Sequence, residues 1–166
     1  MPANTERDYR ILDMISTYLS GGKSSVLYKK LVDQDKKALQ VSANSIGLEK
    51  DGVFAFFAIP MGTTPKAELQ NAIDEEIKKL QTNLISQEDY QKLQNQFENQ
   101  FVNANSSIQG IASSLATNHV LMGDTNLINK EIDIYRSITR EDLRNAAKKY
   151  LNPNQRVIIN YMPEKK

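Results

Sequence analysis

Apolar residues recur along this chain with two spacings, and these predict where helices and strands lie. A spacing of three to four residues, typical of amphipathic helices, is found over residues 8–19, 25–32, 65–80, 86–101, 108–122, 127–135 and 139–150. Alternating or continuous apolar runs, typical of strands, are found over residues 39–45, 53–59 and 156–161. The predicted order of elements is therefore α-α-β-β-α-α-α-α-α-β.

This order predicts an α+β domain of two layers, with a mostly antiparallel sheet and helices packed on one face. Residues 53–59 are apolar at every position, which predicts an inner strand covered on both sides or nearly so. Three strands are few for so many helices. We therefore expect a further strand either before Met1 or from a partner.

Polar residues and prolines mark several of the element boundaries. Thr64 is predicted to cap a helix that has Pro65 at its first position, and Ser86 and Thr139 are predicted to cap two later helices. Asp51-Gly52 predicts the tight turn between the first two strands.

The predicted elements are arranged around a glycine-containing corner at residues 19–31. Gly21 and Gly22 are expected to end the first helix, because glycine adopts positive φ freely. Ser24 and Ser25 can cap the next helix with their hydroxyls. The corner therefore predicts a tight connection between two helices that leads into the sheet.

Part of this corner also resembles the end of a phosphate-binding P-loop, since it contains Gly22-Lys23-Ser24. That motif needs a glycine five positions before Gly22, where Thr17 stands, and a strand before it, where a helix is predicted. We therefore interpret the segment as a helix boundary with tight packing.

The charge balance and composition exclude several classes of function. The 166 residues include 21 Lys and Arg against 20 Asp and Glu, which gives a net charge of +1. By this charge balance nothing suggests binding to nucleic acid or to a membrane surface, and no apolar run is long enough to cross a bilayer. The absence of cysteine excludes disulfides and cysteine metal sites, and leaves the compartment open.

The single histidine, His119, limits the metal and catalytic chemistry available to the chain. A zinc site without cysteine normally draws on two or three histidines plus carboxylates. A Ser-His-Asp triad remains arithmetically possible, but His119 lies in a predicted helix with no nucleophile elbow near it. We interpret it as a residue of a helix surface or of the edge of the core.

Two acidic clusters are further candidates for chemistry. Asp33 and Asp35 could hold a cation, although such a cluster is more typical of a solvated connector. Asp74, Glu75 and Glu76 could form a catalytic carboxylate group, but they lie largely opposite the buried stripe of their helix. We therefore expect solvent-facing charges at both places.

Three segments carry a family resemblance. The first, Asp8…Ile11-Leu12…Leu19-Ser20-Gly21-Gly22-Lys23-Ser24-Ser25-Val26-Leu27-Tyr28, is similar to a "leu-gly-gly-x-ser-ser-arg-leu-tyr/phe" corner. The second, Ile138-Thr139-Arg140-Glu141-Asp142-Leu143…Ala147-Lys148-Lys149-Tyr150-Leu151, is similar to a "val-thr-x-glu-asp-(val/leu)…ala-x-x-tyr-leu" helix. The third, Asn152-Pro153-Asn154-Gln155-Arg156-Val157-Ile158-Ile159…Pro163, is similar to a closing strand. In this order they resemble the C-terminal, non-zinc-binding domain of the pitrilysin/insulinase-type zinc peptidases, the inverted zincins.

This resemblance implies a processing-peptidase-like fold that occurs in tandem, with two domains in each half and two halves closed around a substrate chamber. In that family, zinc is held in the first domain of the catalytic half by His-x-x-Glu-His plus a distal Glu, and the first Glu acts as general base. With one histidine this chain has no such motif. We therefore expect no catalytic residue, metal ligand or cofactor in this chain, and zinc in a partner domain.

The resemblance also implies an arginine and a tyrosine that hold the substrate backbone in catalytic units. Val32 and Leu39 stand at the matching positions, and neither side chain can donate that hydrogen bond. Because the family's preceding strand would end at Met1-Pro2, we expect residues 1–166 to be a single domain and a fragment of a longer multi-domain chain.

The expected function is that of a non-catalytic C-terminal domain of a zinc metallopeptidase, which forms part of the peptide-binding chamber and packs on the metal-bearing domain. The parent is then a candidate zinc-dependent endopeptidase. One alternative is a scaffold domain of the same fold in a parent that has lost peptidase activity, and another is a stand-alone binding module.

The expected partners are the metal-bearing domain or subunit, a second copy of the chain, or an extended peptide. The peptide would add as a strand to the edge at residues 39–45 or at residues 156–161. The residues that would bind it, the substrate and the compartment stay open.

Overall fold

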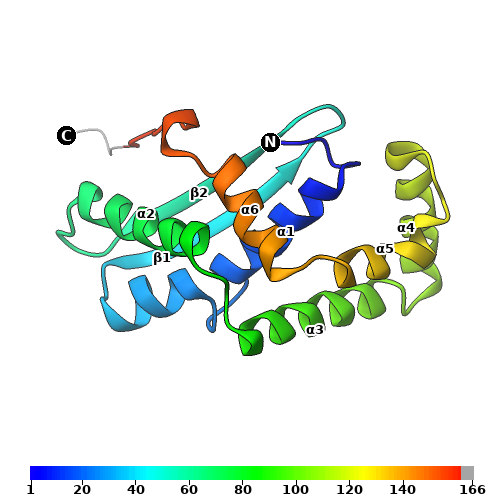
Figure 1. The fold of residues 1–166 in the computed structure, drawn as a ribbon, viewed down its shortest axis with the longest axis horizontal. Helices are drawn as coiled ribbons and strands as arrows, with labels where there is room; N and C mark the ends of the chain where they lie inside the picture. The colour runs from blue at the N-terminus through cyan, green and yellow to red at the C-terminus, as the bar shows by residue number, and fades with distance from the viewer. Residues whose placement is uncertain (162–166) are drawn as a thin grey trace.

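The computed structural model describes residues 1–161. Its elements, in order, are α1 (Arg7–Ser20), the π-helix η1 (Tyr28–Gln34), β1 (Ala38–Gly47), β2 (Gly52–Pro60), α2 (Lys66–Thr82), α3 (Gln87–Ala104), α4 (Ile108–Met122), α5 (Leu127–Arg136), α6 (Arg140–Tyr150) and the 3₁₀ helix η2 (Pro153–Gln155) (Figure 1). The α+β class and the positions of the predicted helices are confirmed. No helix within residues 1–161 combines the length and the apolar character needed to cross a bilayer.

The two strands form an antiparallel hairpin in which Ala43 lies opposite Phe56. The hairpin turn follows Gly47 and ends before Gly52, as Asp51-Gly52 predicts. Helices α1, α2 and α6 lie over one face of this hairpin (Figure 1). The two-layer arrangement is therefore built on a sheet of only two strands within the described residues.

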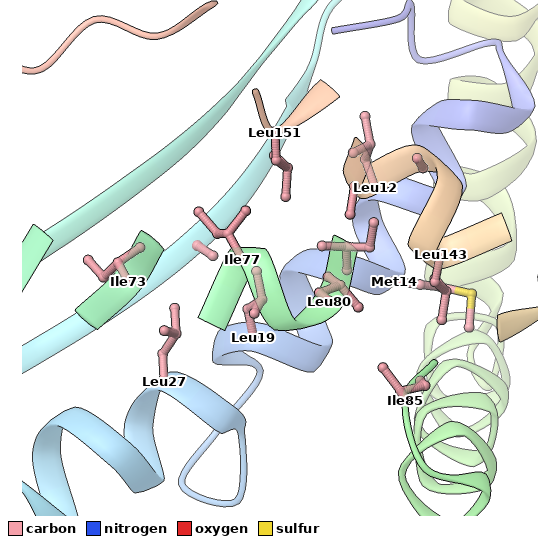
Figure 2. Close-up of a cluster of buried hydrophobic side chains, with 14 of the residues drawn as sticks. Leu12, Met14, Leu19, Leu27, Ile73, Ile77, Leu80, Ile85, Leu143 and Leu151 are labelled. Atoms are coloured by element: carbon pink, nitrogen blue, oxygen red, sulfur yellow. The ribbon is translucent and has the colours of Figure 1, made fainter. Parts of the chain in front are cut away.

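The core lies between α1, α2, α6 and the covered face of the sheet. Figure 2 shows Leu12, Met14 and Leu19 of α1 pointing toward Ile77 of α2 and Leu143 of α6. The side chains of Leu12, Met14 and Leu19 are fully buried. Since α1 supplies the most enclosed side chains, it is the central element of the domain.

The prediction of an inner strand at residues 53–59 is wrong. Val53, Phe57 and Ile59 of β2 are each more than half exposed, whereas Phe54 and Phe56 pack against the core. The physical reason is that the helices cover one face only, and side chains alternate between the two faces of a strand. The second face of β2 therefore carries apolar side chains with no cover in residues 1–161.

The prediction of a strand at residues 156–161 is also wrong for the described residues. Val157, Ile159 and Tyr161 are almost fully exposed, and no neighbouring strand of residues 1–161 accepts this segment. Arg156 instead forms a bidentate ion pair with Asp74 of α2. A β-prone run forms a strand only where a sheet edge can pair with it. Pro163, part of the third family-like segment, lies outside the described residues.

Of the helix caps predicted at Thr64, Ser86 and Thr139, two are confirmed and one is wrong. The hydroxyl of Ser86 accepts a hydrogen bond from the backbone of Asp89 at 3.0 Å, and Thr139 forms a complete capping box with Asp142. The Thr64 hydroxyl does not cap α2 but donates to the carbonyl of Met61 at 2.8 Å. Pro65 is extended and stands just before the helix, so α2 begins one residue later than predicted.

Candidate functional site

The glycine corner has the tight geometry that the sequence predicts. Helix α1 ends at Ser20, and Gly22 has a φ of +129°, outside the regions that other residues adopt readily. A Cβ atom added to Gly21 would lie 2.5 Å from the carbonyl oxygen of Thr17. Both glycines are therefore required by the backbone itself.

The serines of the corner do not cap the next helix as predicted. The Ser25 hydroxyl donates to the carbonyl of Gly22 at 2.6 Å, and the hydroxyl of Ser24 accepts from Lys92 of α3. A helix, not a strand, precedes the segment that resembles a P-loop. The corner is thus docked against α3, and we assign it a packing role.

His119 and the first acidic pair are brought to no common site. His119 lies on the exposed side of α4, and Asp33 and Asp35 lie at the end of η1, where Asp35 faces Lys37 at 3.8 Å. Within residues 1–161, no three His, Asp or Glu side chains are grouped so that they could hold a metal ion.

The second acidic cluster is only partly solvent-facing, which corrects the sequence-based expectation. The side chain of Glu76 is 7% exposed and accepts hydrogen bonds from Lys30 at 3.0 Å and Lys79 at 2.7 Å. The hydrogen bond from Lys30 also lowers the pKa of the exposed Glu75. Asp74 is paired with Arg156, so every carboxylate of the cluster has a cationic partner. The pairs with Lys30 connect α2 to η1, and the pair with Arg156 connects α2 to the segment after α6.

The two positions that match the family's substrate-holding residues lie in different elements and differ in exposure. Val32 lies in η1 and packs partly buried against the core, whereas Leu39 lies at the start of β1 and is largely exposed. Leu39 falls at an irregularity in the register between Ala38 and Gln40. Neither side chain carries a hydrogen-bond donor that could hold a peptide backbone.

The sheet edge predicted for peptide docking at residues 39–45 is blocked at its centre. The backbone N–H of Ala43 donates to the Ser20 hydroxyl at 2.7 Å, and the same hydroxyl donates to the carbonyl of Ala43 at 2.9 Å. A side chain of α1 therefore takes the outward-facing groups that an added strand would need.

The opposite edge of the sheet, on β2, is open. Met1 and Gly52 exchange two backbone hydrogen bonds, of 2.9 and 3.1 Å, on the side of β2 that faces away from β1. Because outward-facing residues alternate along an antiparallel strand, Phe54, Phe56 and Ala58 present the next outward N–H and C=O groups. None of these groups has a backbone partner within residues 1–161. We call this row the β2 edge.

Next to the β2 edge is an apolar surface that sequence reasoning missed. We define the outer face as Ile46 of β1 with Val53, Phe57 and Ile59 of β2, all of them exposed apolar residues on the side of the sheet away from the helices. Phe57 alone is 61% exposed. The two-sided apolar pattern of residues 53–59 carried the signal, but it was interpreted as burial inside the domain.

The chain is similar to a family of peptidase domains and to a curated zinc protease. The family model described as "Peptidase M16 inactive domain" matches residues 1–97. The zinc protease PqqE of Helicobacter pylori is 29% identical to the chain over 169 residues, which cover 98% of this chain and 36% of that protein. The chain thus spans about a third of the length of this curated relative.

Two solved structures share the fold. The crystal structure of a protease from Helicobacter pylori matches with a TM-score of 0.86 and 26% identity, over 93% of this chain and 37% of that one. The inactive peptidase domain of a proposed zinc protease from Bordetella parapertussis matches with a TM-score of 0.86 and 23% identity, over 100% of this chain and 88% of that one.

The family match covers more than half of the chain, including the glycine corner, and the hairpin belongs to the matched part. The resemblance inferred from the three motif segments is confirmed. The zinc site of this family belongs to its catalytic domain, and this chain belongs to the peptidase M16 inactive-domain family.

Proposed function

We propose that this chain is the non-catalytic domain of a longer M16 protein, in which it packs on the metal-bearing domain and forms part of the wall of a peptide-binding chamber. The observation that carries the proposal is the uncovered apolar outer face of the sheet. The length of the Helicobacter relative, of which this chain covers 36%, supports a parent with further domains.

The outer face has the character of an interface between domains. Val53, Phe57 and Ile59 lie on the same face of β2, and each is more than half exposed. Burial of apolar surface contributes roughly 25 cal/mol per Å², so a partner that covers these side chains gains substantial stabilisation. Exposed apolar rows on a soluble domain commonly mark surfaces that another domain or protein covers.

The β2 edge supports a role in holding extended peptide. Its outward N–H and C=O groups at Phe54, Phe56 and Ala58 offer the alternating pattern that an added strand pairs with. The edge adjoins the outer face, so the side chains of an added strand would extend the same apolar surface. We therefore place peptide contact at β2 and not at residues 39–45.

The test is reconstitution with the metal-bearing domain of the same M16 protein, loaded with zinc. Association is measured by light scattering after size-exclusion chromatography, and activity by cleavage of an unstructured peptide. We expect the two domains to associate and only the assembly to cleave. Stoichiometric zinc and cleavage with this chain alone would contradict the proposal, and so would a failure to associate. An assembly that forms without cleaving favours the scaffold alternative.

A matched pair of variants locates the interface. Phe57→Lys places a charge in the outer face and is expected to weaken association by about tenfold or more, because the lysine must be desolvated at the contact. Val102→Lys places the same charge at an exposed apolar position of α3, away from the sheet. Equal effects of the two variants on association would exclude the outer face as the contact.

A further inference from the structure

A cavity of about 380 Å³ lies away from the sheet, between the start of α1 and the helices at the far end of the domain. Arg7 and Arg10 of α1 line one side. Met122, at the end of α4, and Leu127 and Ile134 of α5 line the other. Its volume is within the range of pockets that hold small molecules, about 300–1,000 Å³.

Arg10 is the unusual residue of this cavity. Its side chain is 4% exposed, yet its contacts are long: Nη1 lies 3.5 Å from the carbonyls of Asn4 and Glu6, and Nη2 lies 3.5 Å from the carboxylate of Glu131. Its Nε has no hydrogen-bond partner in the described residues. Ordinary N–H···O bonds measure about 2.7–3.2 Å, so none of the contacts of this buried guanidinium is a short hydrogen bond.

The charges around the cavity favour one carboxylate and disfavour a more highly charged anion. Arg7 also faces the cavity and is held by Asp142 at 2.9 Å and by the carbonyl of Ser137 at 3.0 Å. Asp124 lines the rim and is 3.3 Å from Lys130, while Glu131 approaches Arg10 from α5. The two guanidiniums can still attract one further carboxylate, whereas the three neighbouring carboxylates, those of Asp142, Asp124 and Glu131, oppose a phosphate dianion.

A second acidic group, Asp13, lies near Arg10 on the same helix and is half-buried. Asp13, one turn further along α1, accepts hydrogen bonds from Ser45 at 2.9 Å and from Tyr135 at 3.1 Å. The carboxylate that pairs with Arg10 within the described residues is that of Glu131, and not that of Asp13.

We propose that this cavity binds the carboxylate of an apolar amino acid, either free or as the last residue of a peptide. The carboxylate meets Arg10 and Arg7, and the apolar side chain lies against Met122, Leu127 and Ile134. A carboxylate held bidentately by arginine and an apolar wall beside it are the usual elements of recognition for such a ligand. The proposal concerns this chain alone and does not depend on zinc or on the chamber.

The first experiment titrates the purified chain with three probes by isothermal calorimetry: leucine, N-acetyl-leucine and N-acetyl-leucinamide. Leucine, N-acetyl-leucine or both are expected to bind about tenfold or more tightly than the amide, because only they offer the carboxylate to the arginines. Preference for leucine assigns a free amino acid, and equal or better binding of N-acetyl-leucine assigns a peptide C-terminus. Equal binding of all three, or no binding of any, overturns the proposal.

Single substitutions then test whether the residues that line the cavity contribute to binding. Arg10→Lys keeps the positive charge but loses the planar fork, and is expected to weaken binding about tenfold. Leu127→Glu places a carboxylate on the cavity wall and is expected to weaken binding at least as much. Its matched control is Ile128→Glu, at the next position of α5 and outside the cavity lining. Thermal unfolding checks that each variant is folded. Unchanged binding in Leu127→Glu overturns the proposal even if Arg10→Lys does not fold.

Discussion

Helices α1 and α4 are almost equal in length, at 14 and 15 residues, but the molecule uses them in opposite ways. Helix α1 is amphipathic and buries Leu12, Met14 and Leu19 completely. Helix α4 has no Asp, Glu, Lys or Arg, yet Ile108 is 90% exposed and Asn118 is its only buried residue within the structure. Apolar content therefore does not determine burial, since a helix is buried only where neighbouring elements supply matching faces.

The helical arm, defined as α4 with α5, is joined to the rest of the domain by aromatic and polar contacts. The rings of Phe97 and Tyr135 stack with centroids 4.5 Å apart, and Arg136 pairs with Glu98 at 2.8 Å. The Tyr135 hydroxyl donates to Asp13 of α1 at 3.1 Å. Figure 1 shows α4 at the far end of the molecule from α2, with α5 between α4 and the core. The arm is therefore tied to α3 and α1 by specific side-chain contacts.

The largest expected effect is the difference in stability loss between a substitution in the core and the same substitution in the arm. Leu12→Ala creates a cavity at a fully buried site and is expected to lower the free energy of unfolding by about 2–5 kcal/mol. Leu115→Ala makes the same change on α4, where the side chain is 38% exposed, and is expected to cost less than about 1 kcal/mol. Urea denaturation of both variants measures the difference. Similar losses would mean that the arm is packed as tightly as the core.

A smaller effect is expected at the glycines that end the two helices. Gly22 follows α1 with a φ of +129°, and Gly123 follows α4 with a φ of +70°, close to the left-handed region that some other residues visit. Gly22→Ala is expected to cost about 2 kcal/mol and Gly123→Ala about 1 kcal/mol. Neither added Cβ would meet an atom within 4 Å, so backbone conformation alone is tested. Thermal unfolding of the two variants ranks them, and the reverse order would contradict this explanation.

The smallest effect concerns the contact between the arm and α1, and it depends on pH. Burial raises the pKa of Asp13 above its ordinary value of 3.8, even though the hydroxyls of Ser45 and Tyr135 donate to it. The folded state therefore holds this proton more tightly than the unfolded state, and stability falls as pH rises from about 4 through the raised pKa. In Asp13→Asn this loss is absent. The free energy of unfolding of the variant, relative to that of the unsubstituted chain, should therefore increase from pH 4 to pH 7.

The measurement for this prediction is urea denaturation of both proteins at several pH values. The difference between them isolates Asp13, because carboxyls such as Asp8, whose pKa is lowered by the hydroxyl of Tyr150, titrate in both. A difference that is constant with pH would show that burial does not perturb this carboxyl.

Local sequence determined much of this protein. The periodicity placed the helices, Gly22 ended α1, and Ser86 and Thr139 capped α3 and α6, because each of these features depends on residues within one or two turns. Three motif segments, over the glycine corner, the Thr139 helix and residues 152–163, together indicated the family. The sequence also indicated that no histidine-based zinc motif is present, since it contains one histidine.

Only the tertiary structure decided what lies next to what. The apolar sequence of β2 does not show whether one face or both faces of the strand are covered. Nothing in the sequence around Arg10 indicates that its side chain is buried beside a cavity. Glu76 and Ala43 likewise owe their roles to Lys30 and Ser20, which are distant in the chain. Periodicity specifies which side chains share a face, but burial, ion pairing and open edges depend on long-range packing, which no local pattern encodes.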